Sequence, residues 1–294
     1  MRIQEEPCLY RILMKTNIAP NIDRYVIGAP DVAAKAQPGQ FVVLRLHELG
    51  ERIPISISDW DPTAGTITLV VQAVGHTTQQ MAALEVGDDI LDVLGPLGQP
   101  AVIEPVGTVA CVAGGVGTAI IYPEARQHHR VGNRIITLVG ARTREHLFYQ
   151  EELAEVSQRL VVATDDGSYG YKGFVTDLLR QVIDAGTHLD QVIAIGPIPM
   201  MQAVSELTKR YHIKTVVSLN TIMVDGTGMC GACRVRIGGE AKFCCVDGPE
   251  FDAHLVDFAA LMQRSRLHER SGLGGAVSLD EKGCGCQCHD QGIL

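Results

Sequence analysis

The chain has 294 residues, a formal net charge of −9 at pH 7, 46% hydrophobic residues and 20% charged residues. This length predicts two or three domains, and the negative charge argues against nucleic acid and anionic membrane surfaces as partners. No apolar run approaches the ~18 residues that a membrane span needs, and the N-terminus "MRIQEEPCLY" lacks the apolar core of a signal peptide. We therefore expect a cytoplasmic protein.

Residues 1–100 are predicted to form a small antiparallel β-barrel that makes up the first domain. The segments "GQFVVLRL", "GTITLVVQAV" and "GDDILDVLGPLG" are bounded by Gly, Pro or Asp and contain many β-branched residues, as strands do. Only "TTQQMAALEVG" suggests a short helix. Several short strands with little helix are typical of an antiparallel barrel.

Residues 101–218 are predicted to form a doubly wound α/β domain. Apolar strands alternate with amphipathic helices there, which implies a parallel sheet that is covered on both faces. Strands are expected at 108–115, 134–142, 159–167, 191–197 and 214–219, and helices at 118–129, 145–158, 173–186 and 199–212. Ligands of such sheets bind at the carboxyl ends of the strands.

The first strand of this domain leads into a glycine-rich loop, "VAGGVGTA". Gly114, Gly115 and Gly117 would let the backbone approach a pyrophosphate, and the helix that starts near Thr118 would offer its N-terminal amides. A tight strand–helix turn without a ligand is the alternative. The context of strand, glycines and helix favours the nucleotide site.

The second strand of the domain ends in "GARTRE". Arg142 and Arg144 either meet a ribose phosphate or are solvated loop charges. A Rossmann-type acidic residue about 20 positions after the glycine loop is not evident.

Residues 219–260 form a third segment, rich in Cys and Gly. The chain has nine cysteines, most of them after residue 229. In a reducing compartment such clustering suggests metal binding more than disulfides. A segment this short buries little surface by itself, so a metal centre would help to hold it together.

Four residues of this segment, Asp225, Cys230, Cys233 and Cys245, follow the spacing D-x4-C-x2-C-x11-C. This is the plant-type two-iron spacing with an aspartate in place of the first cysteine. A carboxylate is an anionic oxygen donor that can ligate iron. Zinc is the alternative, but it favours paired C-x2-C or Cys/His sets, and the second pair is missing. The spacing does not decide between Cys244 and Cys245 as the last ligand.

Residues 261–294 are predicted to be a separate tail that ends in "EKGCGCQCHDQGIL". Its potential metal ligands either bind a metal or belong to a disordered tail. These residues are Cys284, Cys286, Cys288 and His289. Elsewhere, Cys8 and Cys111 lie in apolar stretches, and we expect them to be inert core residues.

The order of barrel, nucleotide domain and cysteine-rich segment resembles the ferredoxin–NADP reductase superfamily over roughly residues 5–258. The motif "ERIPISI" resembles its flavin-binding strand, and the resemblance implies flavin contacts from Arg52, Pro54, Ile55 and Ser56. Arg52 stands one residue before the usual arginine position. Such an offset turns a strand side chain to the opposite face.

Two further motifs resemble cofactor-binding loops of the same superfamily. The motif "VGHTT" implies that Gly75, Thr77 and Thr78 hold the FAD pyrophosphate, and "GPLG", residues 95–98, resembles the hinge between the domains. The glycine loop resembles G-x-G-x-x-P, with Ile120 in place of Pro.

The motif "GPIPMMQAV" resembles C-G-P-x-x-M of the superfamily. The resemblance implies that Gly196, Pro197 and Met200 line the nicotinamide pocket. Ile195 stands where the motif has its cysteine, so no thiol is expected near the path of the hydride.

Two branches of the superfamily are nearest in these motifs. One is the electron-transfer subunit of dihydroorotate dehydrogenase. The other is the small (alpha) subunit of NADH-dependent reduced ferredoxin:NADP oxidoreductases, which is similar to the sulfide dehydrogenase small subunit. The alpha subunits share "VDGTGMCGACRV" and "CVDGP" with this chain. The resemblance implies a [2Fe-2S] cluster with Asp225 as the fourth ligand, where the dihydroorotate branch has a cysteine.

The resemblance implies an electron-transfer role in which NAD(H) or NADP(H), FAD and the cluster carry the chemistry and no catalytic side chain is needed. The implied partner is a larger subunit with its own FAD and [4Fe-4S] clusters, where ferredoxin and NADP(H) react and electrons are bifurcated. A dihydroorotate dehydrogenase electron-transfer subunit and a non-redox metal-binding interaction module are the alternatives. The flavin and phosphate motifs argue against the latter.

Overall fold

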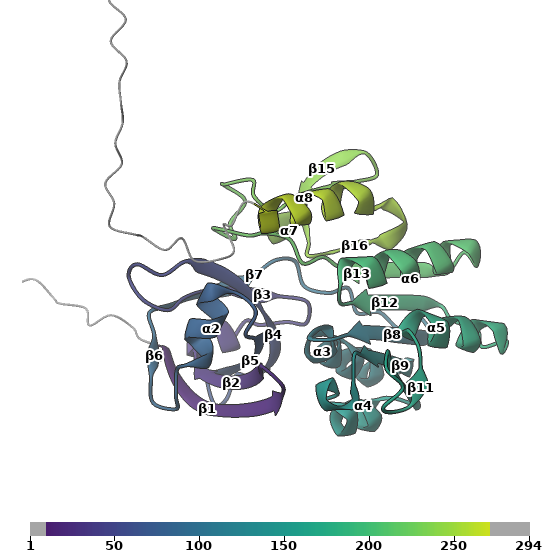
Figure 1. Cartoon of the computed structure of the whole chain (residues 1–294), viewed down its shortest axis with the longest axis horizontal. Coiled ribbons are helices and arrows are strands. Elements are labelled where there is room, and N and C mark those ends of the chain that lie inside the picture. The colour runs from purple at the N-terminus through teal and green to yellow at the C-terminus, as the bar shows by residue number, and fades with distance from the viewer. Residues whose placement is uncertain (1–9, 271–294) are drawn as a thin grey trace, which may run out of the picture.

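The computed structural model describes residues 10–270, which form three parts (Figure 1). A β-barrel (purple to blue) lies beside an α/β domain (teal to green), and a smaller part (yellow-green) lies across the edge where the two meet (Figure 1). Within residues 10–270, no helix combines the length and the apolar character that crossing a membrane requires.

The barrel is one antiparallel sheet with the strand order β6-β1-β2-β5-β4-β3-β7, which curls until it is nearly closed. Its elements are β1 (Tyr10–Ala19), β2 (Ile22–Gly28), α1 (Pro30–Ala33), β3 (Phe41–Arg45), β4 (Arg52–Asp61), β5 (Thr66–Gln72), α2 (His76–Ala82), β6 (Asp89–Ile90) and β7 (Asp92–Leu97). Alternate residues of the strands point inward, and Ile27, Leu44 and Leu69 are buried in the barrel core.

Three expectations for this domain are confirmed, because β3, β5 and α2 lie where the sequence places them. The segment "GDDILDVLGPLG" forms two strands instead of one. The chain bends at Leu91, so that β6 pairs with β1 while β7 pairs with β3 at the other end of the sheet. The sequence does not single out β1 and β2, because polar residues interrupt the apolar alternation of β1.

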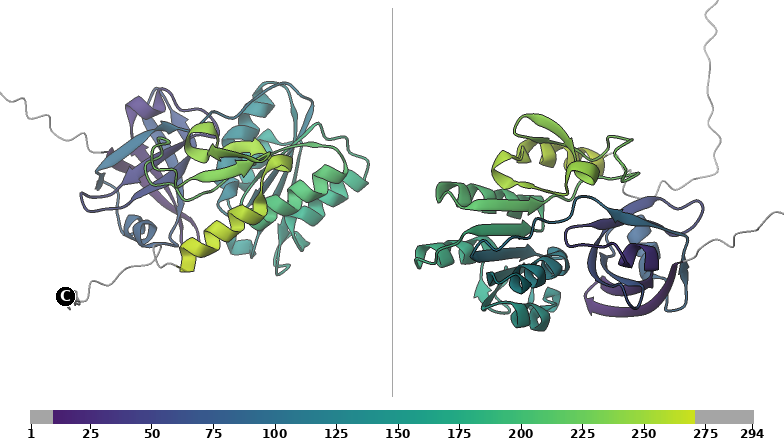
Figure 2. Two further views of the ribbon diagram at one scale, coloured as in Figure 1. Left: turned by 90° about the horizontal axis from the view of Figure 1, so that it is seen from above. Right: turned by 180° about the vertical axis from the view of Figure 1, so that it is seen from behind.

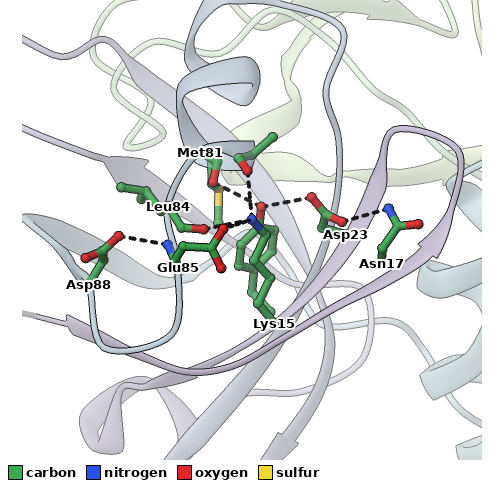
Figure 3. A network of polar contacts seen from close by, with 9 residues as sticks. Lys15, Asn17, Asp23, Met81, Leu84, Glu85 and Asp88 are labelled. Carbon is green, nitrogen blue, oxygen red and sulfur yellow. Dashed lines mark hydrogen bonds and ion pairs between the residues drawn. The ribbon is translucent and has the colours of Figure 1, made fainter.

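A polar network fixes the C-terminal end of helix α2 on the barrel (Figure 3). The Lys15 ammonium donates to the carbonyl oxygens of Ala82 (2.7 Å) and Leu84 (2.8 Å), and the Tyr25 hydroxyl donates to that of Met81 (3.0 Å). A cation is favourable at this end of a helix, where carbonyl groups lack helical partners. The network therefore sets the position of α2 and of the "VGHTT" turn at its other end.

The α/β domain has a sheet with the order β11-β10-β9-β8-β12-β13-β16. Its strands are β8 (Thr108–Gly114), β9 (Arg134–Ala141), β10 (Arg159–Thr164), β11 (Tyr171–Lys172), β12 (Gln191–Ile195), β13 (Lys214–Ser218) and β16 (Glu250–Asp252). All pairs are parallel except β13 with β16. The predicted class, an antiparallel barrel followed by a doubly wound α/β domain, is confirmed.

Helices cover both faces of this sheet, as predicted. They are α3 (Gly117–Arg130), α4 (Gln150–Val156), α5 (Val175–Asp184) and α6 (Ile198–Arg210), with a 3-10 turn, η1, at Arg144–His146. Residues of α3 and α4 pack with one set of alternate strand residues, and those of α5 and α6 pack with the other set. The helix expected at 145–158 begins only at Gln150, because Tyr149 adopts a left-handed conformation with φ 57°.

The third part consists of the hairpin β14 (Arg234–Ile237) and β15 (Glu240–Phe243), the short helix α7 (Cys244–Asp247), the 3-10 turn η2 (Ala253–Leu255) and α8 (Phe258–Arg270). Helix α8 lies beside α6 (Figure 2). Strand β16 leaves this part and joins the sheet of the α/β domain. The domain boundaries at 100, 218 and 260 stay predictions, and the cysteines of the tail lie outside the described residues.

An ion pair joins helix α3 to the barrel. The Arg126 guanidinium donates to the Asp59 carboxylate at 2.5 and 3.2 Å and lies over the rings of Tyr122 (5.1 Å) and Trp60 (5.9 Å). Both charged side chains are partly shielded from solvent, so this two-bond geometry is stronger than a fully exposed pair.

Replacing Arg126 tests whether this pair holds the two domains together. We expect Arg126→Ala to lower the free energy of unfolding by about 1–2 kcal/mol, because a charge-assisted, two-bond contact and its ring packing are lost. Urea unfolding measures the change. Arg130→Ala, at the exposed end of the same helix, is the matched control, and equal stability of the two variants would contradict the prediction.

Candidate functional site

A cleft of about 820 Å³ lies between the barrel and the α/β domain. The barrel contributes residues of β4 and β5, and the α/β domain contributes the segments that follow β8, β9 and β12. The third part closes one side with Leu219, Asn220, Met223 and Pro249. All three parts therefore meet at the carboxyl ends of the parallel strands, where ligands of such sheets bind.

Strand β4 gives the cleft part of its barrel wall. Pro54, Ile55 and Ser56 line the cleft, and their contact with a flavin stays a prediction. Arg52 does not line it; this side chain is exposed at the start of the strand, in register with Arg45. Arg52 has the same strand parity as Pro54 and Ser56, so its distance from the cleft follows from its place at the end of β4 and not from the one-residue offset.

The "VGHTT" turn brings only one of its three predicted residues to the cleft. Thr78 lines the cleft, and its hydroxyl accepts the backbone N–H of Gly75 at 2.9 Å. Gly75 precedes the first residue of α2, outside the lining. Thr77 is buried and donates to the Glu51 carboxylate at 3.1 Å.

The glycine-rich loop after β8 forms the opposite wall. Gly114, Gly115 and Gly117 line the cleft, while Thr118 is buried just behind them. A Cβ atom on Gly117 would lie 2.2 Å from the carbonyl oxygen of Ile195, so only glycine fits here. The glycine lets the first turn of α3 lie directly against the end of β12.

The end of β12 completes this wall with Gly196, Pro197 and Met200, all of which line the cleft. The Met200 sulfur would lie 2.6 Å from a Cβ atom on Gly114. The two motifs that the sequence connects with the nucleotide are thus in contact, on strands that are neighbours in the sheet but distant in the chain.

Of the two arginines after β9, only Arg142 lines the cleft. Arg144 lies over the Tyr169 ring, 5.7 Å from its centroid. Sequence reasoning did not single out His146, Asp165 or Phe174, which also line the cleft. Asp165 follows β10 directly and Phe174 comes shortly after it, so the position after a parallel strand was the available signal.

The candidate metal centre lies in the third part. Cys233 and Cys245 are 2% and 3% exposed, and their sulfur atoms are 3.2 Å apart. Cys230 is exposed, three positions before Cys233. Cys244 is buried and its backbone N–H donates to the carbonyl oxygen of Cys233 (3.2 Å), whereas Cys245 contacts Cys233 through its sulfur atom. Burial raises the pKa of Cys245 to about 12, with the Cys233 thiol as a further cause, so metal binding would have to displace protons from these thiols.

Asp225 completes the predicted ligand set from an exposed loop. Its carboxylate accepts backbone N–H groups from Thr227 (2.9 Å) and Cys230 (2.8 Å). The Thr227 amide and, to a lesser extent, the Cys230 amide hold the pKa of Asp225 below its usual value. The side chain is therefore an anionic oxygen donor tied to the backbone of the neighbouring cysteine.

The donor types fit an iron–sulfur cluster. Three thiols and one carboxylate lie within a short stretch of the chain, and two of the thiols are already in contact. Among the residues that the structure describes, no three His, Cys, Asp or Glu side chains converge as a complete metal site. Ligation would thus bring Cys230 and Asp225 toward the existing pair of thiols.

Comparison with known proteins gives a family for the cysteine-rich segment and another for the α/β domain. Residues 220–257 match the iron-sulfur cluster binding domain of dihydroorotate dehydrogenase B, and residues 111–206 match the oxidoreductase NAD-binding domain. The chain is 47% identical over 256 residues, 87% of this chain and 90% of the relative, to a homolog of the dihydroorotate dehydrogenase B (NAD(+)) electron transfer subunit from Thermotoga maritima.

Two further relatives extend over nearly the whole chain. An uncharacterized protein from the adh 3′ region of Clostridium beijerinckii is 44% identical over 95% of this chain and 99% of its own length. A chain in the structure of NADH-dependent reduced ferredoxin-NADP oxidoreductase, determined for insight into flavin-based electron bifurcation, is 44% identical with a TM-score of 0.85, covering 92% of this chain and 98% of that one. The chain therefore belongs to the family of dihydroorotate dehydrogenase B electron-transfer subunits and their homologues, oxidoreductases that join an NAD-binding domain to an iron–sulfur cluster binding domain.

Proposed function

We propose that this chain is a cytoplasmic iron–sulfur flavoprotein subunit that passes electrons between NAD(H), FAD and a [2Fe-2S] cluster, to or from a larger flavin and iron–sulfur partner. The partner would be that of a bifurcating ferredoxin:NADP oxidoreductase. The observation that carries this proposal is the contact between the cleft and the loop of residues 225–230, called the cluster loop below because it holds Asp225 and Cys230. Phe41 lines the cleft, and a Cβ atom on Gly226 would meet Phe41, Val43 and Leu97 at 2.8–3.7 Å.

This contact supports electron transfer because it leaves only one layer of side chains between the two sites. Met223, two residues before Asp225, also lines the cleft. A flavin bound there would exchange a hydride with NAD(H) and single electrons with the cluster. The cleft wall of Phe41, Val70 and Ile120 is apolar and would exclude water from the reacting groups.

Each wall of the cleft has its own part in this proposal. Pro54, Ile55 and Ser56 would hold the flavin ring, and the turn containing Thr78 would lie at its phosphates. The backbone of Gly115 and Gly117 would lie against the nucleotide phosphates. Pro197 and Met200 would orient the nicotinamide toward the barrel wall. Arg142 would lie on the ribose side, where a positive charge bears on the choice between NADH and NADPH.

Exposed apolar residues on the cluster loop support a protein partner at this face. Met229 is 88% exposed and Val224 is 51% exposed, on either side of Asp225 and next to the exposed Cys230. Large apolar side chains that gather in this way mark interaction sites. A partner that covers them would bring its own electron carrier close to the cluster.

The second candidate function is the electron-transfer subunit of a dihydroorotate dehydrogenase. Relatives with that name from Methanocaldococcus jannaschii and Shouchella clausii are 36% and 34% identical to this chain. Asp225 favours the first proposal, because the resemblance connects an aspartate at this position with the ferredoxin:NADP branch. Co-purification separates the two, since the partners differ in their flavin and cluster content.

Purification of the chain tests the proposed function directly. We expect bound flavin absorbance, about two irons per chain and NADH-driven reduction of an artificial acceptor dye. A colourless, iron-free protein after anaerobic purification would overturn the proposal.

The role of Asp225 is tested by Asp225→Ala, Asp225→Asn and Asp225→Cys. We expect Asp225→Ala to lower cluster affinity about ten-fold or more, because it removes a ligand and a loop contact. Asp225→Asn can still accept an amide N–H but is uncharged, so retention of iron by this variant would indicate a purely structural role. Asp225→Cys supplies a thiolate and should keep the iron with an altered electron paramagnetic resonance spectrum of the reduced state. Unchanged iron and spectra in all three variants would contradict ligation.

The proposed partner surface is tested by Met229→Asp. A charge at this exposed position should weaken the affinity for the partner subunit about ten-fold without changing flavin or iron content, because a desolvated contact would receive a charge. Val131→Asp is the control, since Val131 is also exposed but lies between the end of α3 and the start of β9, at the amino ends of the strands. Equal partner affinity of the two variants, measured by titration, would move the interface elsewhere.

A further inference from the structure

Two carboxyl groups meet beneath the cleft, where all three parts of the structure come together. Glu124 belongs to helix α3 and is fully buried, and neither of its oxygen atoms has a hydrogen-bonding partner among the described residues if both carboxyls are ionised. Glu250 is the first residue of β16, and its Oε1 atom is equally shielded. The two carboxyl groups are neighbours, since each affects the pKa of the other.

Two ionised carboxylates cannot hydrogen-bond to each other, since both only accept. Burial without a counter-charge also disfavours the ionised form. If one group carries a proton, its O–H donates to the other and satisfies both. Burial, and then the neighbouring Glu250, raise the pKa of Glu124, and burial likewise raises that of Glu250.

We propose that Glu124 and Glu250 share one proton, and that this protonated pair holds the third part of the structure, which contains the predicted cluster ligands, on helix α3 and on the barrel. The barrel takes part through Gly39, on which a Cβ atom would lie 3.2 Å from Glu250 Oε1. Ionisation of both groups would place two repelling charges in this joint and loosen it. The proton site also lies directly under the cleft, because Ile120, one helical turn before Glu124, and Pro249, next to Glu250, both line it.

The neighbouring titratable groups do not supply a positive charge that could neutralise a second ionised carboxylate in place of the proton. The Cys111 thiol, on β8, faces Glu124, and burial raises its pKa, so it stays neutral. His128, one turn further along α3, is buried with its pKa lowered by burial and next by Lys214, so it too is neutral. Among the described residues, Lys214 acts on His128, and neither glutamate pKa is shifted by a cation.

A shared proton predicts that the contribution of this pair to folding stability decreases as the pH rises. A carboxyl whose pKa is higher in the folded than in the unfolded protein contributes stability that is fully present below the unfolded value, about 4.5, and is lost as pH rises toward the folded value. His128 works in the opposite direction, because its lowered pKa removes stability as pH falls. The effect of the glutamates is therefore read as the difference between wild type and a glutamate variant.

The test uses the purified holoprotein and the variants Glu124→Gln, Glu250→Gln and Glu155→Gln. Glutamine keeps the shape and donates an N–H to the remaining carboxylate without needing a proton. We expect the melting temperature of wild type, relative to Glu124→Gln, to fall by roughly 5 °C between pH 6 and pH 8. Glu250→Gln should behave in the same way, and Glu155→Gln, at an exposed position of α4, should follow wild type.

Infrared spectroscopy supplies a readout that a purely structural role would not change. Wild type should keep the carbonyl band of a protonated carboxylic acid at pH 7, and Glu124→Gln should lose it. Hydrogen exchange of the β16 amides should become faster in wild type as pH rises, beyond the intrinsic change, and not in Glu124→Gln. Absence of the acid band in wild type at pH 7, or parallel melting curves for wild type and Glu124→Gln, would overturn the proposal.

Discussion

Gly226 lies so close to the barrel that no side chain fits between the cluster loop and strands β3 and β7. Its φ of 73° is one that residues with a Cβ atom rarely adopt, so the position of the loop is fixed both by its own backbone and by the wall it touches. The proposed electron path depends on this contact, because it holds the residues that precede Cys230 against Phe41, which lines the cleft. The cysteine-rich segment is thereby an extension of the cleft wall.

Helix α3 connects the other parts of the structure. Its first turn follows the glycine loop, Arg126 forms an ion pair with Asp59 of the barrel, and Glu124 meets Glu250 of β16. Residues of the same helix thus reach the glycine-loop wall of the cleft, the barrel and the third part. These contacts differ in chemistry: one relies on opposite charges and the other on a shared proton. Solution conditions that weaken one need not weaken the other.

The sequence predicts the parts of the fold that depend on local pattern. The buried strands of the α/β domain are continuous apolar runs, and the glycine loop and the ligand spacing are local motifs, so their existence and order are readable. Features that depend on tertiary contacts are not. β16 has only three residues and becomes a strand because β13 offers it an edge, and the short α7 turn brings the sulfur of Cys245 to that of Cys233.

The candidate site shows the same division. Pro54, Ser56, Gly115 and Met200 all line the cleft, whereas Arg52 lies outside it, because it is the exposed first residue of β4. Phe174 and Asp165 carry no distinctive pattern and enter the cleft only through sheet topology. The pairing of Glu124 with Glu250 is invisible in the sequence, since these residues are far apart in the chain and neither belongs to a motif.

The return of the chain through β16 has an evolutionary consequence. Ser218, the last residue of β13, and Glu250, the first of β16, are register partners, so the intervening segment leaves and re-enters the sheet at the same place. An excursion with adjacent ends can be lengthened, exchanged or deleted at little entropic penalty to the scaffold. A flavin reductase that lacked this segment could thus have gained the metal-binding residues as one insertion between two neighbouring strands.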